Sequence, residues 1–571
     1  MTSAPPAPRF DIRDIPFSHY GSWFALSPVT ANARHDAGDV VHLVSHQQGM
    51  HAVLRLRTAA ETRIEATPSR LSWIAADSGR IEAAYESADT LRLRGSGLSL
   101  EIAAAAPELT PFSGTYLYRD PVDGSYIFTS YETGRRYRVT VLAGAVTVEG
   151  DQALGASARA ITTSSPGWEI AVEEYRAGRA AYAASESFDD AERRAARAFA
   201  GFVDRIAPWR SARTPAAELA AYVLWSATVS PSGFLARPAV LMSKHWMDKV
   251  WSWDHCFNAL ALADGEPELA WHQFLLPFDH QDDSGALPDS VTHSEVLYNY
   301  VKPPIHGWAL GLLRARPTMA VGDAAELKEL YASLERWTEY WLGRRAPGSP
   351  LPHYHHGNDS GWDNATTFDR ARVVESADLS AFLVLQLHEL AALAADLGEP
   401  DLSAQWTARA KELLAALLDT LWTTGDRFAA RIVETGELRV GDSLLDTMPI
   451  ILGEHLPEHV HTALAARVAR HLTDHGPATE RRDSPEYAAD GYWRGPIWAP
   501  STLLIEDGLR RAGHVELADE ISRRFRTLCE TSGFAENFDA DTGAGLRDRA
   551  YTWTASVYLV LARAAAHRGA R

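Results

Sequence analysis

The sequence predicts a mixed α+β chain, with an antiparallel β-sandwich over residues 1–184 followed by an (α/α)6 barrel of helical hairpins over residues 185–571. The chain has 571 residues, more than one ordinary hydrophobic core holds, so at least two domains are expected. Before residue 185 the apolar residues alternate in short segments, and after it they follow a helical period. Hydrophobic residues form 46% of the chain and charged residues 23%, which is typical of a folded globular protein.

Short segments of alternating polarity, separated by turn residues, predict the strands of the N-terminal region. The turns include ADSG at 76–79 and DPVDG at 120–124, which are rich in the Gly, Pro, Asp and Ser residues that end strands. Regularly spaced short strands with such turns are typical of an antiparallel sandwich. The predicted strands are 40–45, 52–56, 62–66, 71–75, 80–85, 90–94, 126–130, 137–142 and 168–175.

Helical periodicity begins near residue 185 and continues through the rest of the chain. Ser187 precedes acidic residues, a pattern that is typical of a helix N-cap and first turn. About a dozen amphipathic helices in succession predict six hairpins that close into an α/α barrel. An open helical solenoid is the alternative, but the sequence lacks the fixed-period repeat that a solenoid requires. The predicted helices are 187–206, 219–230, 254–262, 268–278, 305–314, 324–342, 379–397, 402–421, 443–452, 458–472, 500–512, 515–531 and 552–566.

The charge and the cysteines argue against several classes of partner. A net charge of −19 disfavours nucleic acid and anionic membrane surfaces. Cys256 and Cys529 are far apart in sequence and suggest neither a disulfide framework nor a metal knuckle. Residues 1–10 lack a basic stretch followed by an apolar core, and no apolar run approaches the roughly 20 residues that span a bilayer. We expect a cytoplasmic protein with no membrane partner, and the sequence leaves the oligomeric state open.

Two carboxylates in aromatic, glycine-rich segments are the most informative feature for function. Asp363 lies in GNDSGWDN (357–364), and Glu536 lies in GFAENFDADTG (533–543). Glycoside hydrolysis needs two separated carboxyl groups, one that protonates the leaving oxygen and one that activates water or attacks the sugar carbon. Asp363 is the predicted general acid, since Trp362 and the glycine turn can bury it and favour its protonated form. Glu536, with its aromatic neighbours, is the predicted general base.

Each of these polar residues also has a plainer interpretation. Asp363 can form an Asx turn or cap a helix, and Glu536 can be a solvated residue of a turn. Asp359 is the nearest competitor of Asp363, and it either binds a sugar hydroxyl or braces the loop. Arg494 can orient the base carboxylate, donate to sugar oxygens or form a structural ion pair.

Further loop residues complete the predicted sugar site. Aromatic rings provide faces for a sugar ring, although a single tryptophan is more often a core residue. Asp254 and Lys302 can bind sugar hydroxyl groups, and Asp254 can equally cap the helix that follows it. The tryptophans predicted to contact substrate are Trp253, Trp362, Trp493, Trp498 and Trp553.

No cofactor and no catalytic metal are expected. His353, His355 and His356 precede the Asp363 segment, and a zinc or calcium site there is conceivable. The sequence has no HExxH helix and no EF-hand pattern, so we interpret the histidines as part of a solvated polar loop. It also lacks a convincing phosphate-cradling loop or nucleophile elbow, which disfavours nucleotide and acyl-transfer chemistry.

Five segments of the helical region together resemble a known enzyme family. They are WSWDHCF (251–257), KPPIHGWAL (302–310), GNDSGWDNATTFD (357–369), YWRGPIW (492–498) and FAENFDADTG (534–543). In this order they are similar to bacterial members of glycoside hydrolase family 63, which includes processing α-glucosidases, mannosylglycerate hydrolases and glucosylglycerate hydrolases. The N-terminal region matches the family only in general plan.

The resemblance implies an α/α barrel of six hairpins and an inverting mechanism without a covalent intermediate. It places the acid of the family on Asp363 and its base on Glu536. The substrate-binding positions of the family fall on Trp253, Asp254, Lys302, Trp493 and Arg494. The chain departs from the family at GWDNATTFD (361–369), where many members continue from Asp-Asn into Ser-Pro, and this departure concerns which sugar or aglycone is bound.

We expect an inverting, exo-acting α-glycosidase with a small carbohydrate substrate, in the first place an α-glucosidase acting on a short oligosaccharide or glucosyl conjugate. Inversion predicts a carboxyl separation of roughly 6.5–9.5 Å between Asp363 and Glu536. One alternative is a mannosylglycerate or glucosylglycerate hydrolase. The others are a sugar epimerase or isomerase with a histidine pair such as His255 and His355, and a glycan-binding protein without activity.

Overall fold

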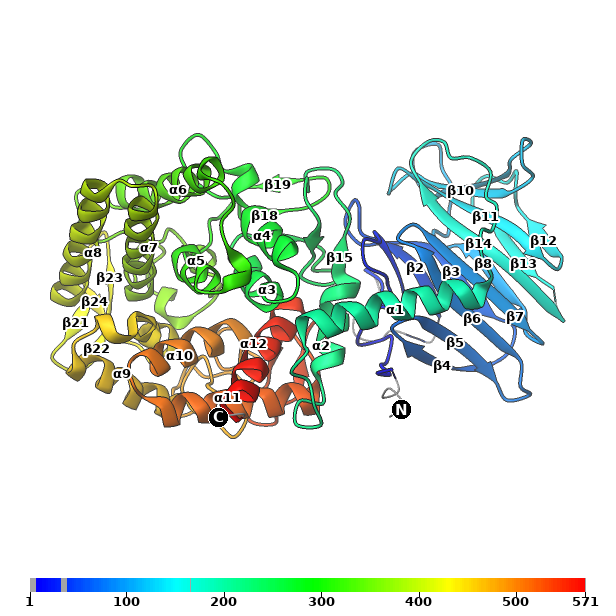
Figure 1. Cartoon of the computed structure of the whole chain (residues 1–571). Helices are drawn as coiled ribbons and strands as arrows, with labels where there is room; N and C mark the ends of the chain where they lie inside the picture. The colour runs from blue at the N-terminus through cyan, green and yellow to red at the C-terminus, as the bar shows by residue number, and fades with distance from the viewer. Residues whose placement is uncertain (1–6, 32–37, 39, 165, 570–571) are drawn as a thin grey trace. The chain divides into compact units, whose positions relative to one another are not determined.

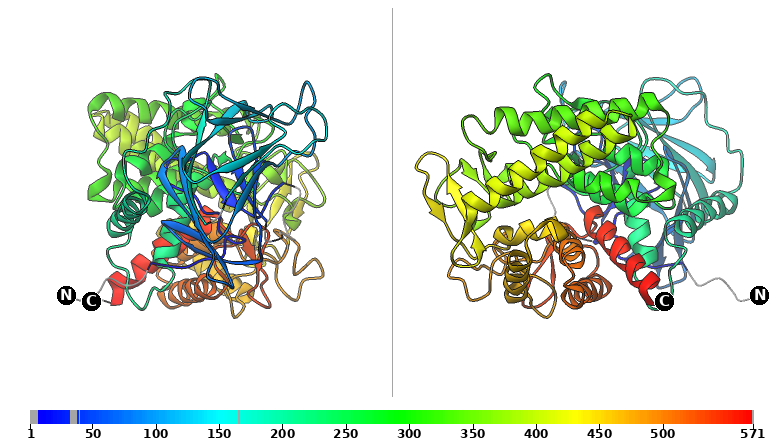
Figure 2. Two further views of the ribbon diagram at one scale, coloured as in Figure 1. Left: turned by 90° about the vertical axis from the view of Figure 1, so that its right-hand side faces the viewer. Right: turned by 60° about the vertical axis from the view of Figure 1, so that its left-hand side comes forward.

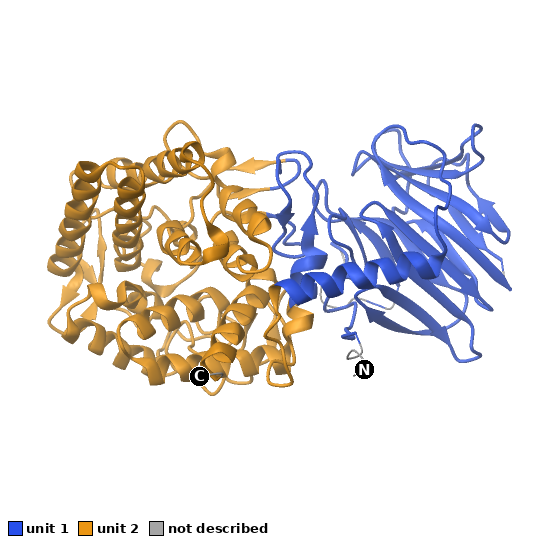
Figure 3. Cartoon of the chain, viewed as in Figure 1, with its two compact units in different colours: residues 1–205, 221–249, 292–294 blue, residues 206–220, 250–291, 295–571 orange. Residues whose placement is uncertain are grey.

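The chain forms two compact units (Figure 3). The computed structural model describes residues 7–31, 38, 40–164 and 166–569 (Figure 1). Unit 1 comprises residues 1–205, 221–249 and 292–294, and unit 2 comprises residues 206–220, 250–291 and 295–571. The predicted division between residues 184 and 185 lies just before helix α1 (Phe188–Ile206), most of which belongs to unit 1. The domain boundary between residues 184 and 185 stays a prediction.

Unit 1 contains two antiparallel sheets, which confirms the predicted antiparallel β region. One sheet has the strand order β1-β2-β3-β8-β13-β12, and the other has the order β4-β5-β6-β7-β14-β11-β10-β9. The strands are β1 (Phe24–Ser27), β2 (Val41–Ser45), β3 (His51–Thr58), β4 (Thr62–Thr67), β5 (Arg70–Ala75), β6 (Arg80–Ser87), β7 (Thr90–Ser96), β8 (Leu100–Ala104), β9 (Thr115–Arg119), β10 (Tyr126–Ser130), β11 (Arg135–Ala143), β12 (Val146–Glu149), β13 (Ala160–Thr163) and β14 (Gly167–Tyr175).

The two sheets share one hydrophobic core. Leu43 and Leu54 of the six-stranded sheet belong to the same buried cluster as Leu71, Leu93 and Phe128 of the eight-stranded sheet. Every predicted strand overlaps one of these strands. The strands that were not predicted from the sequence are β1, β8, β9, β12 and β13. Of these, β1 and β13 are buried on nearly all their residues, so they show no alternation of polarity.

The rest of the chain contains helices joined by loops and short strands, and every predicted helix overlaps a helix in the structure. The α-helices after α1 are α2 (Ala217–Ala227), α3 (Asp254–Leu262), α4 (Pro267–Leu275), α5 (His306–Arg314), α6 (Ala324–Glu339), α7 (Ala377–Asp396), α8 (Pro400–Leu421), α9 (Glu458–His471), α10 (Ala499–Arg511), α11 (Val515–Ser532) and α12 (Thr552–Gly569). Short helical turns are η1 (Phe278–His280), η2 (Pro317–Met319), η3 (Tyr340–Arg344), η4 (Gly357–Ser360), η5 (Thr366–Phe368) and η6 (Leu444–His455). Short strands are β15 (Thr228–Val229), β16 (Ala239–Val240), β17 (Val250–Trp251), β18 (Ser290–Val291), β19 (Val296–Leu297), β20 (Val374–Glu375), β21 (Trp422–Thr423), β22 (Arg427–Phe428), β23 (Ala430–Ile432), β24 (Leu438–Arg439), β25 (Asn537–Phe538) and β26 (Gly545–Leu546).

One predicted helix has a different form from that expected. The segment 443–452 is a 3-10 segment, η6, and not an α-helix. Pro449 lies inside it and cannot donate a backbone hydrogen bond, and Gly453 interrupts it with φ of 55°. The tighter 3-10 hydrogen-bonding pattern is the consequence.

Six elements of unit 2 pack on one another in a ring. α3 packs on α5, α5 on α7, α7 on η6, η6 on α10, α10 on α12, and α12 on α3. α4, α8 and α9 each pack on one member of the ring, and Figure 2 shows α7 and α8 side by side. All residues of α3 are buried, whereas most residues of α8 are not. Unit 2 thus has an inner ring of elements and further helices outside it.

α7 is the one helix, among the described residues, that is long and apolar enough to cross a membrane. In its most apolar stretch 83% of the residues are buried inside the protein, which is the pattern of a core helix. The expected lack of a signal peptide rests on residues 1–10, of which residues 1–6 lie outside the described part of the chain. The cytoplasmic location stays a prediction.

Candidate active site

Asp363 lies in a loop that follows the turn η4. Gly361 ends this turn with φ of 74°, and a Cβ at its position would come within 2.5 Å of the Trp253 ring. Glycine is therefore required for both the backbone conformation and the close approach. Trp362 is buried, whereas 31% of the Asp363 side chain is exposed. The loop presents a carboxyl group at the edge of a buried aromatic layer.

Lys302 connects Asp363 to further carboxylates. Its Nζ lies 3.1 Å from Oδ1 of Asp289 and 3.9 Å from Oδ1 of Asp363, and it donates a 2.9 Å hydrogen bond to the Asn358 carbonyl. Burial alone would lower the pKa of Lys302, but the carboxylates of Asp363, Asp289 and Asp254 raise it overall. Burial raises the pKa of Asp363, and the Lys302 ammonium opposes this shift. Asp363 thus keeps its proton to a higher pH than an exposed aspartate, as a general acid should.

Asp254 is the first residue of α3 and is buried close to this group. Burial raises its pKa to about 8, although the charge of Lys302 acts in the opposite direction. Its Oδ2 atom is buried and accepts no hydrogen bond from any residue that the structure describes. A buried carboxyl oxygen without a partner is unfavourable, so this atom is available to a substrate hydroxyl group.

Glu536 lies directly before β25 and is buried. Its Oε1 accepts a 3.1 Å hydrogen bond from the Tyr492 hydroxyl, and its backbone N–H donates to the Asp548 carbonyl at 2.7 Å. Burial, followed by the charge of Asp548, raises the pKa of Glu536 to about 8. The hydrogen bond from Tyr492 and the charge of Arg547 lower it in turn. Glu536 therefore keeps its proton to a higher pH than an exposed glutamate.

The structure brings the Asp363 and Glu536 segments into one network. Oδ1 of Asn364 accepts a 3.0 Å hydrogen bond from the Trp493 N–H, and the neighbouring Tyr492 bonds to Glu536. Burial raises the pKa of the Tyr492 hydroxyl, and the carboxylates of both Glu536 and Asp363 raise it further. The charges of both predicted catalytic groups thus act on the same hydroxyl. The predicted separation of the two carboxyl groups stays a prediction. Their catalytic roles stay predictions.

The five predicted tryptophans form one buried cluster under these loops. The rings of Trp493 and Trp498 stack with centroids 4.0 Å apart, and Trp362 lies 4.6 Å from Trp493. Trp253 and Trp498 contact Trp553 edge to face, at 5.8 and 5.5 Å. None of the five is more than 4% exposed. The cluster supports both carboxylate loops, and a direct contact between these rings and substrate stays a prediction.

Asp359 and Arg494 have their side chains engaged by the protein. Oδ1 of Asp359 accepts from the Val301 N–H at 3.2 Å, and Oδ2 pairs with Arg345 at 3.1 Å. Arg494 donates from Nε to the Asn364 carbonyl at 2.8 Å and pairs with Asp369. Both therefore brace the loops around Asp363, one of the alternatives left open for each of them.

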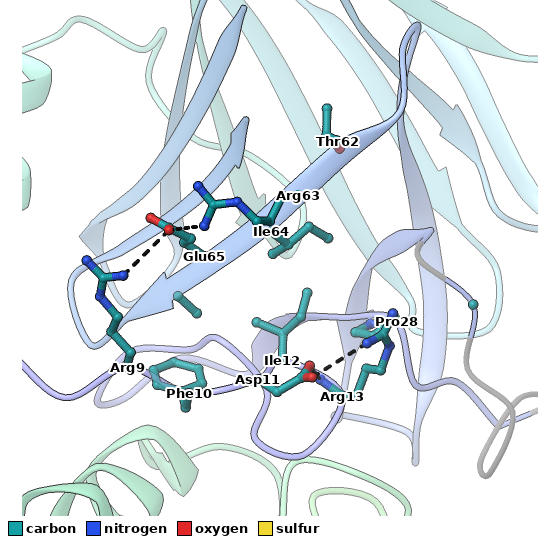
Figure 4. A pocket seen from close by; sticks show the side chains of 12 residues that line it. Arg9, Phe10, Asp11, Ile12, Arg13, Pro28, Thr62, Arg63, Ile64 and Glu65 are labelled. Carbon is teal, nitrogen blue, oxygen red and sulfur yellow. Dashed lines mark hydrogen bonds and ion pairs between the residues drawn. The ribbon is translucent and has the colours of Figure 1, made fainter. Parts of the chain in front are cut away.

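Two cavities lie beside the Asp363 loop. The first has a volume of about 420 Å³, and its lining includes Asp363, His356, Arg370 and Arg372. The second has a volume of about 240 Å³ and shares Asp369 and Arg370 with the first. A third cavity, of about 580 Å³, lies in unit 1 between residues 9–13 and strand β4 (Figure 4). No predicted site residue lines this third cavity.

The histidines near the loop have local partners. His353 and His355 stack, with their Nε2 atoms 3.2 Å apart, and Nδ1 of His255 lies 3.2 Å from the Trp251 carbonyl oxygen. Among the described residues, no group of three or more His, Cys, Asp or Glu side chains is arranged to hold a metal ion.

Sequence reasoning missed the roles of Asp289 and Tyr492. The two residues lie in LPDS (287–290) and YWRGPIW (492–498), and only the folded chain shows that they contact Lys302 and Glu536. A tyrosine next to a predicted substrate-binding tryptophan was the only available signal for Tyr492.

The fold and this site define a glycoside hydrolase. The family model described as "Mannosylglycerate hydrolase MGH1-like glycoside hydrolase domain" matches residues 247–554. The chain belongs to this family of glycoside hydrolases, and the resemblance to glycoside hydrolase family 63 is confirmed.

Several characterised proteins and structures are similar to the chain. A mannosylglycerate hydrolase of Rubrobacter radiotolerans is 24% identical over 57% of this chain and 93% of its own length. A glucosylglycerate hydrolase of Mycolicibacterium hassiacum is 24% identical over 61% of this chain and 97% of its own. The crystal structure of the family 63 mannosylglycerate hydrolase of Thermus thermophilus in complex with glucose has a TM-score of 0.53 and 21% identity, covering 60% of this chain and 99% of that one. A bacterial glucoamylase complexed with acarbose has a TM-score of 0.63 and 12% identity, covering 99% of this chain and 96% of its own. The two structures establish a likeness of fold.

Proposed function

We propose that the enzyme hydrolyses mannosylglycerate or glucosylglycerate by an inverting, exo-acting mechanism. Hydrolases of both compounds are among the similar proteins, which supports this function over the first expectation of a general α-glucosidase. Membership in a glycoside hydrolase family also favours hydrolysis over the epimerase and glycan-binding alternatives. We further propose that the ring of α3, α5, α7, η6, α10 and α12 is the inner layer of the predicted (α/α)6 barrel.

The observation that carries the proposal is a pair of arginines in the cavity beside Asp363. Arg370 and Arg372 both line this cavity, and neither forms an ion pair with a residue in the described part of the chain. Guanidinium groups bind carboxylates through paired, charge-assisted hydrogen bonds. A glycosylglycerate carries a carboxylate on its aglycone, next to the glycosidic oxygen that Asp363 would protonate. A neutral oligosaccharide carries no such group.

In the proposed reaction, Asp363 donates a proton to the glycosidic oxygen while Glu536 accepts a proton from water. The water oxygen attacks the anomeric carbon on the face opposite to the breaking C–O bond, and glycerate leaves with the proton from Asp363. Tyr492 holds Glu536 through its hydrogen bond, and Asp254, with its free Oδ2, binds a sugar hydroxyl. An α-glycoside therefore yields the β-anomer of the free sugar.

The test compares charged and neutral substrates. We expect mannosylglycerate or glucosylglycerate to be hydrolysed with a kcat/KM at least about tenfold higher than that of the matching glycosylglycerol, which lacks only the carboxylate. Proton NMR of the first turnovers should show the β-anomer of the sugar. Equal rates for the two substrates, a preference for maltose, or release of the α-anomer would each contradict the proposal.

Two variants locate the carboxylate site. Arg370→Ala and Arg372→Ala should each raise KM for the glycosylglycerate about tenfold or more and leave the hydrolysis of glycosylglycerol unchanged, because only the charged aglycone loses a partner. Arg344→Ala is the matched control, since Arg344 is exposed and does not line the cavity.

A further inference from the structure

We propose that Glu480 and Asp446 are positioning residues that hold the Asp363 loop in its working conformation. The inference rests on the proposed role of Asp363 as general acid. It goes beyond that role because neither residue is part of the network around Lys302, Tyr492 and Glu536. Both carboxylates line the cavity of about 240 Å³.

Two threonines of the loop donate to these carboxylates. Oγ1 of Thr366 donates to Oε2 of Glu480 at 2.8 Å, and Oγ1 of Thr367 donates to Oδ1 of Asp446 at 3.2 Å. Both threonines belong to η5, the turn that follows Asp363 and Asn364. The hydrogen bonds therefore fix the turn that determines where the acid carboxyl points.

The carboxylates come together through a backbone pairing between distant segments. Ser443 and Glu480 form an isolated antiparallel bridge, with the Leu444 N–H donating to the Thr479 carbonyl at 2.8 Å. Asp446 follows Ser443 in η6, so this bridge places it next to Glu480. Ser484 then donates from its hydroxyl to the second oxygen, Oε1, of Glu480 at 2.7 Å.

Both carboxyl groups are buried without an ion pair. Glu480 is 1% exposed and Asp446 is 7% exposed, and neither forms a salt bridge with a residue that the structure describes. The nearby Arg481 pairs instead with Asp442 and Asp483. Burying two unpaired carboxyl groups destabilises a fold. We infer that Glu480 and Asp446 are buried at this position because they accept the hydrogen bonds that hold the Asp363 loop.

A second set of hydrogen bonds holds the loop through the segment 491–494. Asn364 bonds to the backbone of Trp493 and Gly491, and Arg494 bonds to Asn364 and Asp369. Two sets of hydrogen bonds thus hold the loop and its turn.

The test exploits a substrate whose leaving group does not need an acid. Departure of glycerate requires a proton from Asp363, whereas an α-glycosyl fluoride releases fluoride with far less need for one. Glu480→Ala and Thr366→Val should each lower kcat for the glycosylglycerate at least about tenfold with little change in KM. The same variants should hydrolyse the matching glycosyl fluoride within about threefold of the wild-type rate. Glu480→Gln, which keeps a carbonyl oxygen for Thr366, should restore most of the activity.

Thr531→Val is the control variant in the same two-substrate comparison. Thr531→Val removes an exposed threonine hydroxyl that bonds only to its own helix, and it should change neither rate. Equal losses on both substrates would show a general structural effect and overturn the inference, as would unchanged activity in both variants. Thr366→Val is a smaller change that removes the hydroxyl donor to Glu480, so the comparison of the two substrates can still be made with this variant if Glu480→Ala does not fold. If the wild-type enzyme cleaves maltose but no glycosylglycerate, the proposed substrate is wrong, and maltose serves as the acid-dependent substrate in the same comparison.

Discussion

Tyr492 has a left-handed backbone conformation, with φ of 64°, which is unfavourable for a bulky side chain. Such a conformation costs about 1–3 kcal/mol and persists only where the surroundings impose it. Here Trp498 donates from Nε1 to the Tyr492 carbonyl at 2.8 Å, and the Arg547 guanidinium lies 4.9 Å from the centre of the phenol ring. These contacts hold the phenol against Glu536. The strained backbone of Tyr492 therefore lies at the residue that orients the predicted base.

Replacing this phenol with a phenyl ring should shift the pH dependence of catalysis. The hydrogen bond from Tyr492 stabilises the ionised form of Glu536 and lowers its pKa from the higher value that burial alone would impose. In Tyr492→Phe the pKa of Glu536 rises, so the acidic limb of kcat/KM should move to higher pH by roughly one unit, equivalent to about 1.4 kcal/mol. The profile of kcat/KM between pH 5 and pH 9 measures this shift.

Tyr487→Phe is the control for this experiment. Tyr487 also donates to a carboxylate, that of Asp541 at 3.3 Å, but not to Glu536. Its removal should leave the acidic limb in place. If the acidic limb of the kcat/KM profile does not move in Tyr492→Phe, or moves to lower pH, then Glu536 is not the group whose ionisation controls that limb.

At the residue scale, sequence reasoning predicted types of residue better than their partners. The neighbours of Asp363 and Glu536 were sufficient to identify both as candidate carboxylates. The ion pair between Lys302 and Asp289, and the hydrogen bond between Tyr492 and Glu536, join segments that only the folded chain brings together. Local sequence does not indicate which residues form such pairs, because tertiary packing determines which side chains meet.

At the scale of elements, the helices were predictable and the loops between them were not. Periodic spacing of apolar residues located each helix, because the helices bury these residues against their neighbours. The 3-10 segment η6 was mistaken for an α-helix, although Pro449 in its interior was visible in the sequence. The conformation of the turn η4, which leads to Asp363, depends on a single glycine against the Trp253 ring.

Substitution of that glycine should damage both stability and activity. In Gly361→Ala the new Cβ lies 2.5 Å from the Trp253 ring at a φ of 74°, so the ring or the loop must move. We expect a loss of about 2–4 kcal/mol in the free energy of unfolding, combining backbone strain and overpacking, together with a drop in kcat. Urea unfolding and steady-state kinetics on the same preparation measure the two effects.

A second glycine provides a matched control. Gly348 has the same φ of 74°, but a Cβ at its position would meet no atom within 4 Å, so Gly348→Ala carries the backbone strain alone. The difference between the two variants isolates the contact with Trp253. Equal destabilisation, with kcat unchanged in Gly361→Ala, would show that this contact does not position the acid loop.

At the scale of the whole molecule, buried ionisable groups occur in both units. Burial raises the pKa of Glu174 in unit 1 to about 7. In unit 2 it raises the pKa of Asp254 to about 8, that of Asp446 to about 7 and that of Glu536 to about 8. Only part of this set was visible in the sequence: Asp254 and Glu536 lie in predicted site segments, whereas the burial of Glu174 and Asp446 results from packing.

These four carboxyl groups predict that the protein loses stability as the pH rises from 6.5 to 8.5. In the unfolded chain all four ionise near pH 4, so over this interval only the folded protein holds their protons. When the folded state binds more protons, each increase in pH favours unfolding. Lys244 acts in the opposite direction, because burial lowers its pKa well below the usual value. Burial also lowers the pKa of histidines such as His306 and His471, but this opposing effect is confined to the lower end of the interval, because histidines of the unfolded chain titrate near pH 6.5. We expect the free energy of unfolding to fall by more than about 1 kcal/mol across the interval, which urea unfolding followed by tryptophan fluorescence at each pH can measure.

Two variants assign this pH dependence to particular groups. Glu536→Gln removes one of the four carboxyl groups, so the loss of stability between pH 6.5 and pH 8.5 should become smaller. Glu520→Gln should leave the dependence unchanged, because hydrogen bonds from Arg523 and Arg524 lower the pKa of Glu520 to about 2 and keep it ionised throughout the interval. Stability that stays constant or increases toward pH 8.5 in the wild type would mean that the buried carboxyl groups are already ionised at pH 6.5. In that case Glu536 would be available as a base well below neutral pH, and the acidic limb of kcat/KM should lie correspondingly lower.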